Sequence, residues 1–199
     1  GHPLAMRAAD TAFQCRSELA ALFNMKEPER VIFTTNATHG LNIAIKSLVP
    51  RGGRVVVSGY EHNAVTRPLA ALGADISAAD APPFDRETAV AAFERLIVPG
   101  IDAVICNHVS NVFGCIQPIE AVAELCRDRG VPLIVDISQS AGILPLDMER
   151  LGAAFIAMPG HKGLYGPQGT GILLCGGDGL PAALLEGGTG SISLSQEMP

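Results

Sequence analysis

The sequence predicts an α/β fold, a three-layer α/β/α domain around a mainly parallel seven-stranded sheet. Short apolar runs alternate along the chain with longer segments in which apolar side chains recur at helical spacing. Runs such as 132–136 are apolar almost throughout, which is typical of strands covered by helices on both faces. With 199 residues, of which 48% are hydrophobic and 17% charged, the chain can bury a substantial core.

Apolar periodicity and turn residues define the helices. The first helix carries an apolar stripe from Leu4 to Leu22, and the second opens at Asn36-Ala37-Thr38 and stops near Pro50. Gly130 marks the end of the last long helix. The predicted helices cover about residues 3–23, 63–72 and 85–97, a segment from 36 to near Pro50, and a segment from 119 to Gly130.

Seven short apolar runs define the strands, at residues 31–34, 54–58, 74–78, 102–107, 132–136, 154–158 and 171–175. In parallel α/β sheets, ligands gather at the carboxyl ends of the strands. The polar residues that follow the predicted strands are therefore candidates for one site. They are Thr38, Glu61, His62, Asn111, Asp136, Gln139, His161 and Lys162.

Charge and composition exclude several classes of function. A net charge of -6 without any block of Lys and Arg argues against a nucleic-acid surface. No apolar run approaches the roughly 20 residues that span a membrane. The cysteine count is odd and lacks paired metal spacing, and no signal peptide precedes the first helix, so we expect reduced, mostly buried thiols in a cytoplasmic protein.

A glycine-rich turn that contains Lys162 follows the apolar run 153–158. Lysine is normally a solvated surface residue, so its place between a buried strand and tight turns indicates chemistry by its amine, such as a Schiff base. The glycines at 166–171 come after this lysine instead of after a first strand, and their spacing is not that of a dinucleotide-binding loop. A Walker-type phosphate loop is absent as well.

Three further residues each have a structural and a functional interpretation. Asp136 ends a buried strand, where it either caps the next helix or pairs with a cation such as a protonated pyridine nitrogen. Thr38 belongs either to an ordinary helix cap or to a phosphate site at a helix start. His62 is either a cap or an imidazole that stacks on a flat cofactor and moves a proton.

Four motifs occur in a fixed order and spacing. They are Glu61-His62-Asn63, residues 108–114 (His-Val-Ser-Asn-Val-Phe-Gly), Val135-Asp136-Ile137-Ser138-Gln139 and Gly160-His161-Lys162. In this arrangement they resemble the class V aminotransferase family of fold type I pyridoxal phosphate enzymes, and within it the cysteine desulfurases and desulfurase-like proteins. The resemblance extends from the first helix to Gly187-Gly188-Thr189-Gly190.

The resemblance implies a role for each candidate residue. Lys162 would hold pyridoxal 5'-phosphate as a Schiff base and move the substrate's alpha proton, and His62 would stack on the pyridine ring. Asp136 would pair with the ring nitrogen. Gln139 and Asn111 would reach the ring hydroxyl or the substrate, while Ala37, Thr38 and His161 would bind the phosphate.

Two positions depart from the family pattern. Pro159 stands where desulfurases commonly carry a phosphate-binding hydroxyl, two positions before His161, and proline offers neither a hydroxyl nor an amide donor. His39 follows Thr38 where the family often has an acid. We therefore expect phosphate binding to depend on other groups.

The resemblance also implies that residues 1–199 are the cofactor-binding large domain alone. Family members have an N-terminal segment and a small C-terminal domain with the nucleophilic cysteine and a substrate-binding arginine. We expect none of Cys15, Cys106, Cys115, Cys126 and Cys175 to take that cysteine's place. Apolar surfaces should be exposed where those parts and a second subunit would pack.

Three functions remain open at this stage. The first is a homodimeric cysteine desulfurase, which converts L-cysteine to L-alanine and passes sulfur to an enzyme cysteine and then to an acceptor protein. The second keeps the cofactor but assigns transamination or a lyase reaction on another amino acid. The third is a catalytically inactive domain with a binding role.

Overall fold

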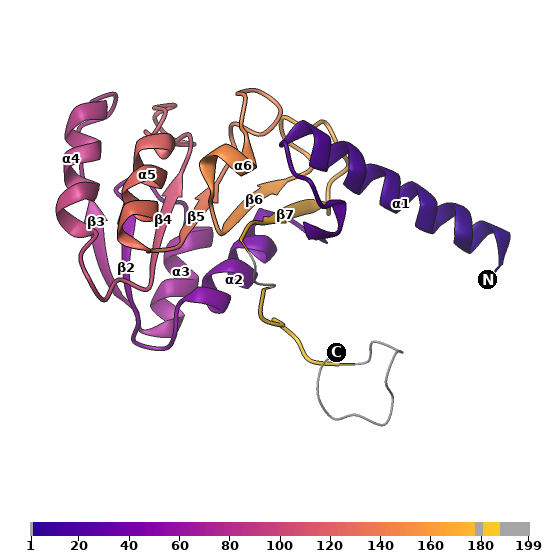
Figure 1. The fold of residues 1–199 in the computed structure, drawn as a ribbon, viewed down its shortest axis with the longest axis horizontal. Helices are drawn as coiled ribbons and strands as arrows, with labels where there is room; N and C mark the ends of the chain where they lie inside the picture. Colours follow the sequence, from indigo (N-terminus) through magenta and orange to yellow (C-terminus); the bar gives the residue numbers. More distant parts are fainter. Residues whose placement is uncertain (1, 178–180, 188–199) are drawn as a thin grey trace.

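The computed structural model describes residues 2–177 and 181–187 and contains a twisted seven-stranded sheet between two helical layers (Figure 1). The order of strands across the sheet is β1-β7-β6-β5-β4-β2-β3. The predicted fold class is confirmed. The strands are β1 (Val31–Thr34), β2 (Arg54–Ser58), β3 (Asp75–Ala79), β4 (Ala103–Asn107), β5 (Leu133–Asp136), β6 (Phe155–Pro159) and β7 (Gly171–Cys175).

Parallel pairing dominates the sheet. The strands β3, β2, β4, β5 and β6 are parallel to their neighbours, whereas β7 is antiparallel to both β6 and β1. Since β7 alone runs backwards, β1 points in the same direction as β6. The carboxyl ends of six strands therefore lie at one edge of the sheet.

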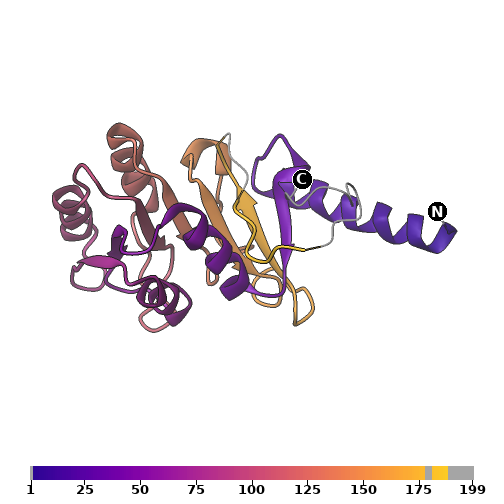
Figure 2. The ribbon, with the colours of Figure 1, turned by 90° about the horizontal axis from the view of Figure 1, so that it is seen from below.

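Helices cover both faces of the sheet (Figures 1 and 2). Residues alternate between the faces along each strand, as in β4, where Val104 and Cys106 join one core cluster and Ala103 and Ile105 join the other. One face packs against α2 (Ala37–Leu48) and α3 (Asn63–Leu72), and the other against α4 (Arg86–Leu96), α5 (Ile119–Arg129), α6 (Met148–Leu151) and the end of α1 (Pro3–Leu22).

Most of α1 projects away from the body of the domain (Figures 1 and 2). Ala20 is its one buried residue, and Leu4 and Phe13 are exposed. Ile143 and Tyr165 also expose large side chains. Large apolar side chains are therefore exposed on α1 and in the loops after β5 and β6.

The structure contains short elements that the sequence analysis does not predict. They are α6 and the 3-10 turn η1 (Pro28–Arg30), each too short to show apolar periodicity. The sequence of β3 has few large apolar residues because β3 is an edge strand with largely exposed side chains. Residues 188–190 of the expected glycine segment lie outside the described residues. None of the described helices has the length and apolar character needed to cross a membrane.

All five cysteines are free, as expected. Four are buried, and Cys15 on α1 is exposed. Burial raises the pKa of Cys126 to about 12 and that of Cys175 to about 11, and it raises the pKa of Cys106 as well. These thiols are therefore protonated and shielded near neutral pH.

We predict that one thiol per folded chain reacts rapidly with a disulfide reagent near neutral pH. Cys15 is accessible, whereas the other four require unfolding. Thiol titration of the native and the denatured chain, with Cys15→Ser as control, measures this difference. Rapid reaction of a second thiol in the native chain would contradict the buried positions.

Candidate active site

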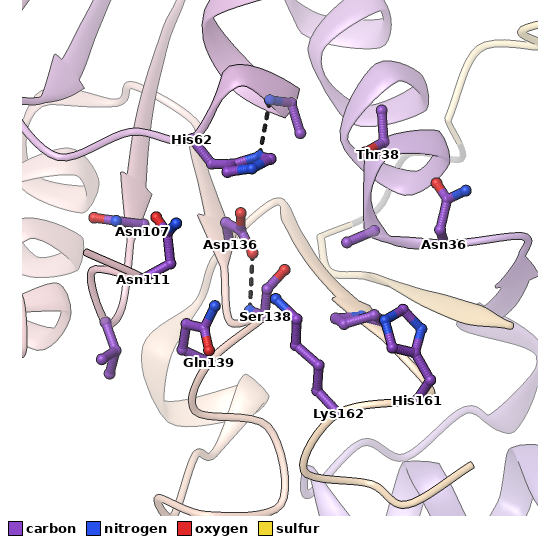
Figure 3. Close-up of a pocket in the computed structure, with 14 residues that line it drawn as sticks. Asn36, Thr38, His62, Asn107, Asn111, Asp136, Ser138, Gln139, His161 and Lys162 are labelled. Carbon is purple, nitrogen blue, oxygen red and sulfur yellow. Dashed lines mark hydrogen bonds between the residues drawn. The ribbon is translucent and has the colours of Figure 1, made fainter. Parts of the chain in front are cut away.

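A cavity lies at the edge of the sheet where the parallel strands end (Figure 3). Turns after β1, β2, β4, β5 and β6 each contribute to its wall. The eight residues to which the family resemblance gives a role line it, namely Ala37, Thr38, His62, Asn111, Asp136, Gln139, His161 and Lys162, whereas the remaining candidate Glu61 does not. The prediction did not assign a role to the other lining residues, Asn36, Ala64, Asn107, Val109, Ser138 and Pro159.

The turn from β1 into α2 forms one side of the cavity. Asn36 is the helix cap, because its side-chain Oδ1 accepts a hydrogen bond of 2.9 Å from the amide of His39. The capping role therefore belongs to Asn36 and not to Thr38. The amides of Ala37 and Thr38 in the first helical turn have no acceptor within the helix, and this helix start favours an anion.

Gly171 at the start of β7 lets the sheet approach this turn. A Cβ atom at this position would lie 2.5 Å from the carbonyl carbon of Asn36 and 2.7 Å from Oγ1 of Thr34. A larger residue would therefore push the Asn36 turn away from β7. The glycine fixes the position of the helix start relative to the rest of the cavity.

His62 has the helix-capping role that was one of its two expected interpretations. It caps α3, since its Nδ1 accepts a hydrogen bond of 3.1 Å from the amide of Ala64, and its ring also lines the cavity above Asp136 (Figure 3). With Nδ1 as the acceptor, the neutral ring carries its proton on Nε2. One face of the imidazole remains available to a ligand.

Asp136 ends β5 on the floor of the cavity and is 5% exposed. Its Oδ1 accepts a hydrogen bond of 2.8 Å from the amide of Ser138 (Figure 3). This bond lies in a turn, because no helix begins directly after β5, so the expected role as a helix cap is wrong. Its Oδ2 has no hydrogen bond within the part of the chain that the structure describes. A carboxylate this buried needs a cationic or donor partner, and the cavity is where a ligand would supply it.

Lys162 lies in the tight turn after β6, which the amides of Tyr165 and Gly166 close by hydrogen bonds to Lys162 O and Gly160 O. Its side chain extends into the cavity toward Ser138 (Figure 3). No ion pair of its amine occurs among the described residues. Pro159, at the end of β6, lines the cavity and has no amide hydrogen to donate.

Glu61 is a polar residue of the site to which the sequence analysis gave no role of its own. Its Oε1 forms a hydrogen bond of 2.5 Å with Ser58 Oγ and accepts one of 2.7 Å from the amide of Asn107. Its Oε2 is buried and has no hydrogen bond within the described residues. Burial raises the pKa of Glu61 to about 8, and the charge of Asp136 contributes in the same direction, against the lowering effect of the two hydrogen bonds.

The cavity brings together groups with complementary chemistry. The amine of Lys162 can form a Schiff base with a carbonyl, and the carboxylate of Asp136 can pair with a cation. The helix start at Ala37 and Thr38 can hold an anion, and the ring of His62 can cover a flat group between them. The cavity therefore suits a planar, anionic carbonyl compound with a basic ring atom.

The sequence profile of the family Aminotransferase class-V matches residues 1–197, and the chain belongs to this family. It is 33% identical over 179 residues to the cysteine desulfurase IscS of Shewanella denitrificans, covering 86% of this chain and 44% of that protein. It is 32% identical over 201 residues to a probable cysteine desulfurase of Methanothermobacter thermautotrophicus, covering 94% and 48%. The chain thus spans about half the length of these curated relatives.

Solved structures share the fold. The apo structure of a cysteine desulfurase from Thermococcus onnurineus superposes with a TM-score of 0.80 at 29% identity, covering 87% of this chain and 44% of that one. A variant of C-DES with glycine covalently linked to its PLP cofactor gives a TM-score of 0.80 at 28% identity, covering 89% and 49%. The three-layer α/β/α arrangement of this chain is therefore the fold that these solved structures share.

We predict that the stability of the chain falls with pH relative to a Glu61→Gln variant between about pH 5 and pH 8. Glu61 keeps its proton in the folded chain up to about 8 and loses it near 4.5 when unfolded, so unfolding releases a proton in this range. The free energy of unfolding then decreases by up to about 1.4 kcal/mol per pH unit. Denaturant unfolding of the wild type and of Glu61→Gln across this pH range measures the free energy of unfolding. If this free energy had the same pH dependence in both proteins, the prediction would be wrong.

Proposed function

We propose that residues 1–199 form the PLP-binding large domain of an enzyme that acts on an amino acid. The observation that carries this proposal is the convergence of Lys162, Asp136 and the start of α2 on one cavity. The residues fit the cofactor. Oδ2 of Asp136 has no hydrogen bond among the described residues and can bind a cation, and the amides of Ala37 and Thr38 at the start of α2 can bind an anion. Family membership supports the same cofactor.

PLP, when bound, supplies a ring that withdraws electrons from the substrate's Cα. We assign to Lys162 the covalent attachment of the cofactor and, after displacement by the substrate amine, the transfer of the alpha proton by its free amine. His62 would cover the ring and orient it. Its Nε2 proton would be available at the edge of the cavity.

The remaining residues would bind the cofactor by charge and hydrogen bonding. Asp136 would hold the ring nitrogen in its protonated form. Thr38, the amide of Ala37 and His161 would bind the phosphate at the start of α2. Gln139 and Asn111, on the side of the cavity away from α2 in Figure 3, would reach the ring hydroxyl or the substrate.

We assign the reaction as cysteine desulfuration, in which L-cysteine becomes L-alanine and its sulfur passes to an enzyme cysteine. The named relatives at 32% and 33% identity support this assignment. Four cysteines of this chain are buried and Cys15 lies on α1, so we propose that the accepting cysteine belongs to the remainder of a full-length homodimeric enzyme. We also propose that a separate acceptor protein receives the sulfur. The enzyme would be located in the cytoplasm.

A C–S lyase or class V aminotransferase reaction is the second candidate. It is favoured by the likeness to the cystine C–S lyase C-DES, whose structure in complex with its product cysteine persulfide has a TM-score of 0.80 at 28% identity. Analysis of products from the full-length enzyme separates the candidates. Alanine supports a desulfurase, a keto acid supports the second candidate, and cofactor binding without turnover supports a binding role alone.

We predict that Lys162→Ala abolishes a borohydride-reducible adduct between the chain and PLP. The cavity contains no other lysine among its lining residues. Mass spectrometry after reduction measures the adduct, and Lys46→Ala on α2, an exposed position, serves as the matched control. An adduct that persists in Lys162→Ala would overturn the attachment site.

We predict that Asp136→Ala still binds PLP but slows alpha-proton exchange in the full-length enzyme by about 10²-fold to 10³-fold. Without the carboxylate, the ring nitrogen loses the charge that keeps it protonated. Loss of substrate deuterium to water, followed by mass spectrometry, measures the rate. A rate near that of the wild type would show that the nitrogen needs no anion in this cavity.

A further inference from the structure

We propose that Glu61 is a positioning residue of the cavity, which acts as a neutral carboxylic acid. In this form it holds the turn that carries His62 against β4 and leaves Asp136 as the carboxylate of the site. The proposal rests on the proposed function only for the identity of the ligand. Its structural basis is a buried hydrogen-bond network that joins the ends of β2 and β4.

The network consists of Ser58, Glu61 and Asn107. Ser58 and Asn107 are buried, at 2% and 4% exposed, and end their strands β2 and β4. Oε1 of Glu61 lies 2.5 Å from Ser58 Oγ and 2.7 Å from the amide nitrogen of Asn107. Ser58 Oγ also lies 3.1 Å from Asn107 Oδ1.

Counting protons distinguishes the two charge states of Glu61. The Ser58 hydroxyl has one proton but two neighbouring acceptors, Glu61 Oε1 and Asn107 Oδ1. If Glu61 is ionised, this proton goes to the carboxylate, and Asn107 Oδ1 loses its donor. If Glu61 is protonated, its carboxyl donates to Ser58 Oγ, and the Ser58 hydroxyl donates to Asn107 Oδ1. The neutral acid therefore satisfies one more buried polar atom than the carboxylate does.

The second carboxyl oxygen supports the same charge state. Oε2 of Glu61 is buried without a hydrogen bond among the residues that the structure describes. The free energy needed to bury a neutral carbonyl oxygen here without a hydrogen bond is far smaller than that needed to bury part of a negative charge. Asp136 ends β5 directly beside Asn107, in register, so a second ionised carboxyl would also repel the charge of Asp136.

The network acts on the cavity through the turn between β2 and α3. Nδ2 of Asn107 donates a hydrogen bond of 2.7 Å to Tyr60 O, and Glu61 directly precedes His62. The hydroxyl of Tyr60 donates to Ala81 O on the other side of the turn. The backbone that leads into His62 is thus held from both sides. Asn107 itself lines the cavity, so the same residues set the position of His62 and of the adjacent floor.

Infrared difference spectroscopy of the ligand-free chain tests the charge state. Near neutral pH the wild type should show the carbonyl band of a protonated carboxylic acid, and Glu61→Gln should lack it. Ser58→Ala removes the acceptor of the acid proton, so the band should move to higher frequency. Absence of the band in the wild type, or a band unaffected by Ser58→Ala, overturns the proposal.

Binding of PLP tests the positioning role. Glu61→Gln stays neutral and keeps an acceptor for the amide of Asn107 but loses the donation to Ser58 Oγ, so its Kd should rise less than that of Glu61→Ala, which should bind about tenfold more weakly or worse. Glu149→Gln, at an exposed position on α6, is the matched control. Equal losses in Glu61→Gln and Glu61→Ala would show that a charge is needed and would overturn the neutral role.

The two proposals fail in different ways. If the wild type does not bind PLP, the proposed function fails, but the infrared band of the ligand-free chain still decides the state of Glu61. If Glu61→Ala does not fold, as circular dichroism would show, the infrared spectra and the Glu61→Gln affinity still decide between the neutral acid and the carboxylate.

Discussion

Parallel pairing of β2, β4, β5 and β6 is the constraint on which the site depends. Because these strands run in the same direction, the residues that follow them arrive at one edge, although they lie far apart in the sequence. The register pair Asn107 and Asp136 sets the floor of the cavity. The apolar strand interiors, fully buried between two helical layers, give this edge a rigid support.

Two carboxyl groups near the floor of the cavity have opposite environments. Asp136 has one oxygen bound to the amide of Ser138 and one directed to the cavity, where a cation can reach it. Glu61 has one oxygen in a hydrogen-bond network and one enclosed without a donor among the described residues. Burial raises the pKa of Glu61 to about 8, and Asp136 is the carboxyl group that faces the cavity.

Local apolar periodicity predicted the seven strands and the five long helices, whereas the eight residues with an expected role in the cavity came from the resemblance to the class V aminotransferase family. The sequence could not reveal that Asn36 caps α2, since Asn36 and Thr38 are both suitable caps until the backbone is known. It also could not reveal the role of Glu61. That role depends on contacts with Asn107, which approaches only through the pairing of β2 with β4.

The antiparallel strand β7 has a consequence for the order in which the domain forms. β1 lies at the edge of the sheet and pairs only with β7 among the described strands. Thr34 of β1 therefore has no strand partner before Gly171 of β7 has been synthesised. During synthesis the strand that carries the Asn36 turn is therefore unpaired until nearly all of the described chain has emerged. The side of the cavity that the start of α2 forms thus depends on a strand pairing that closes a very long loop.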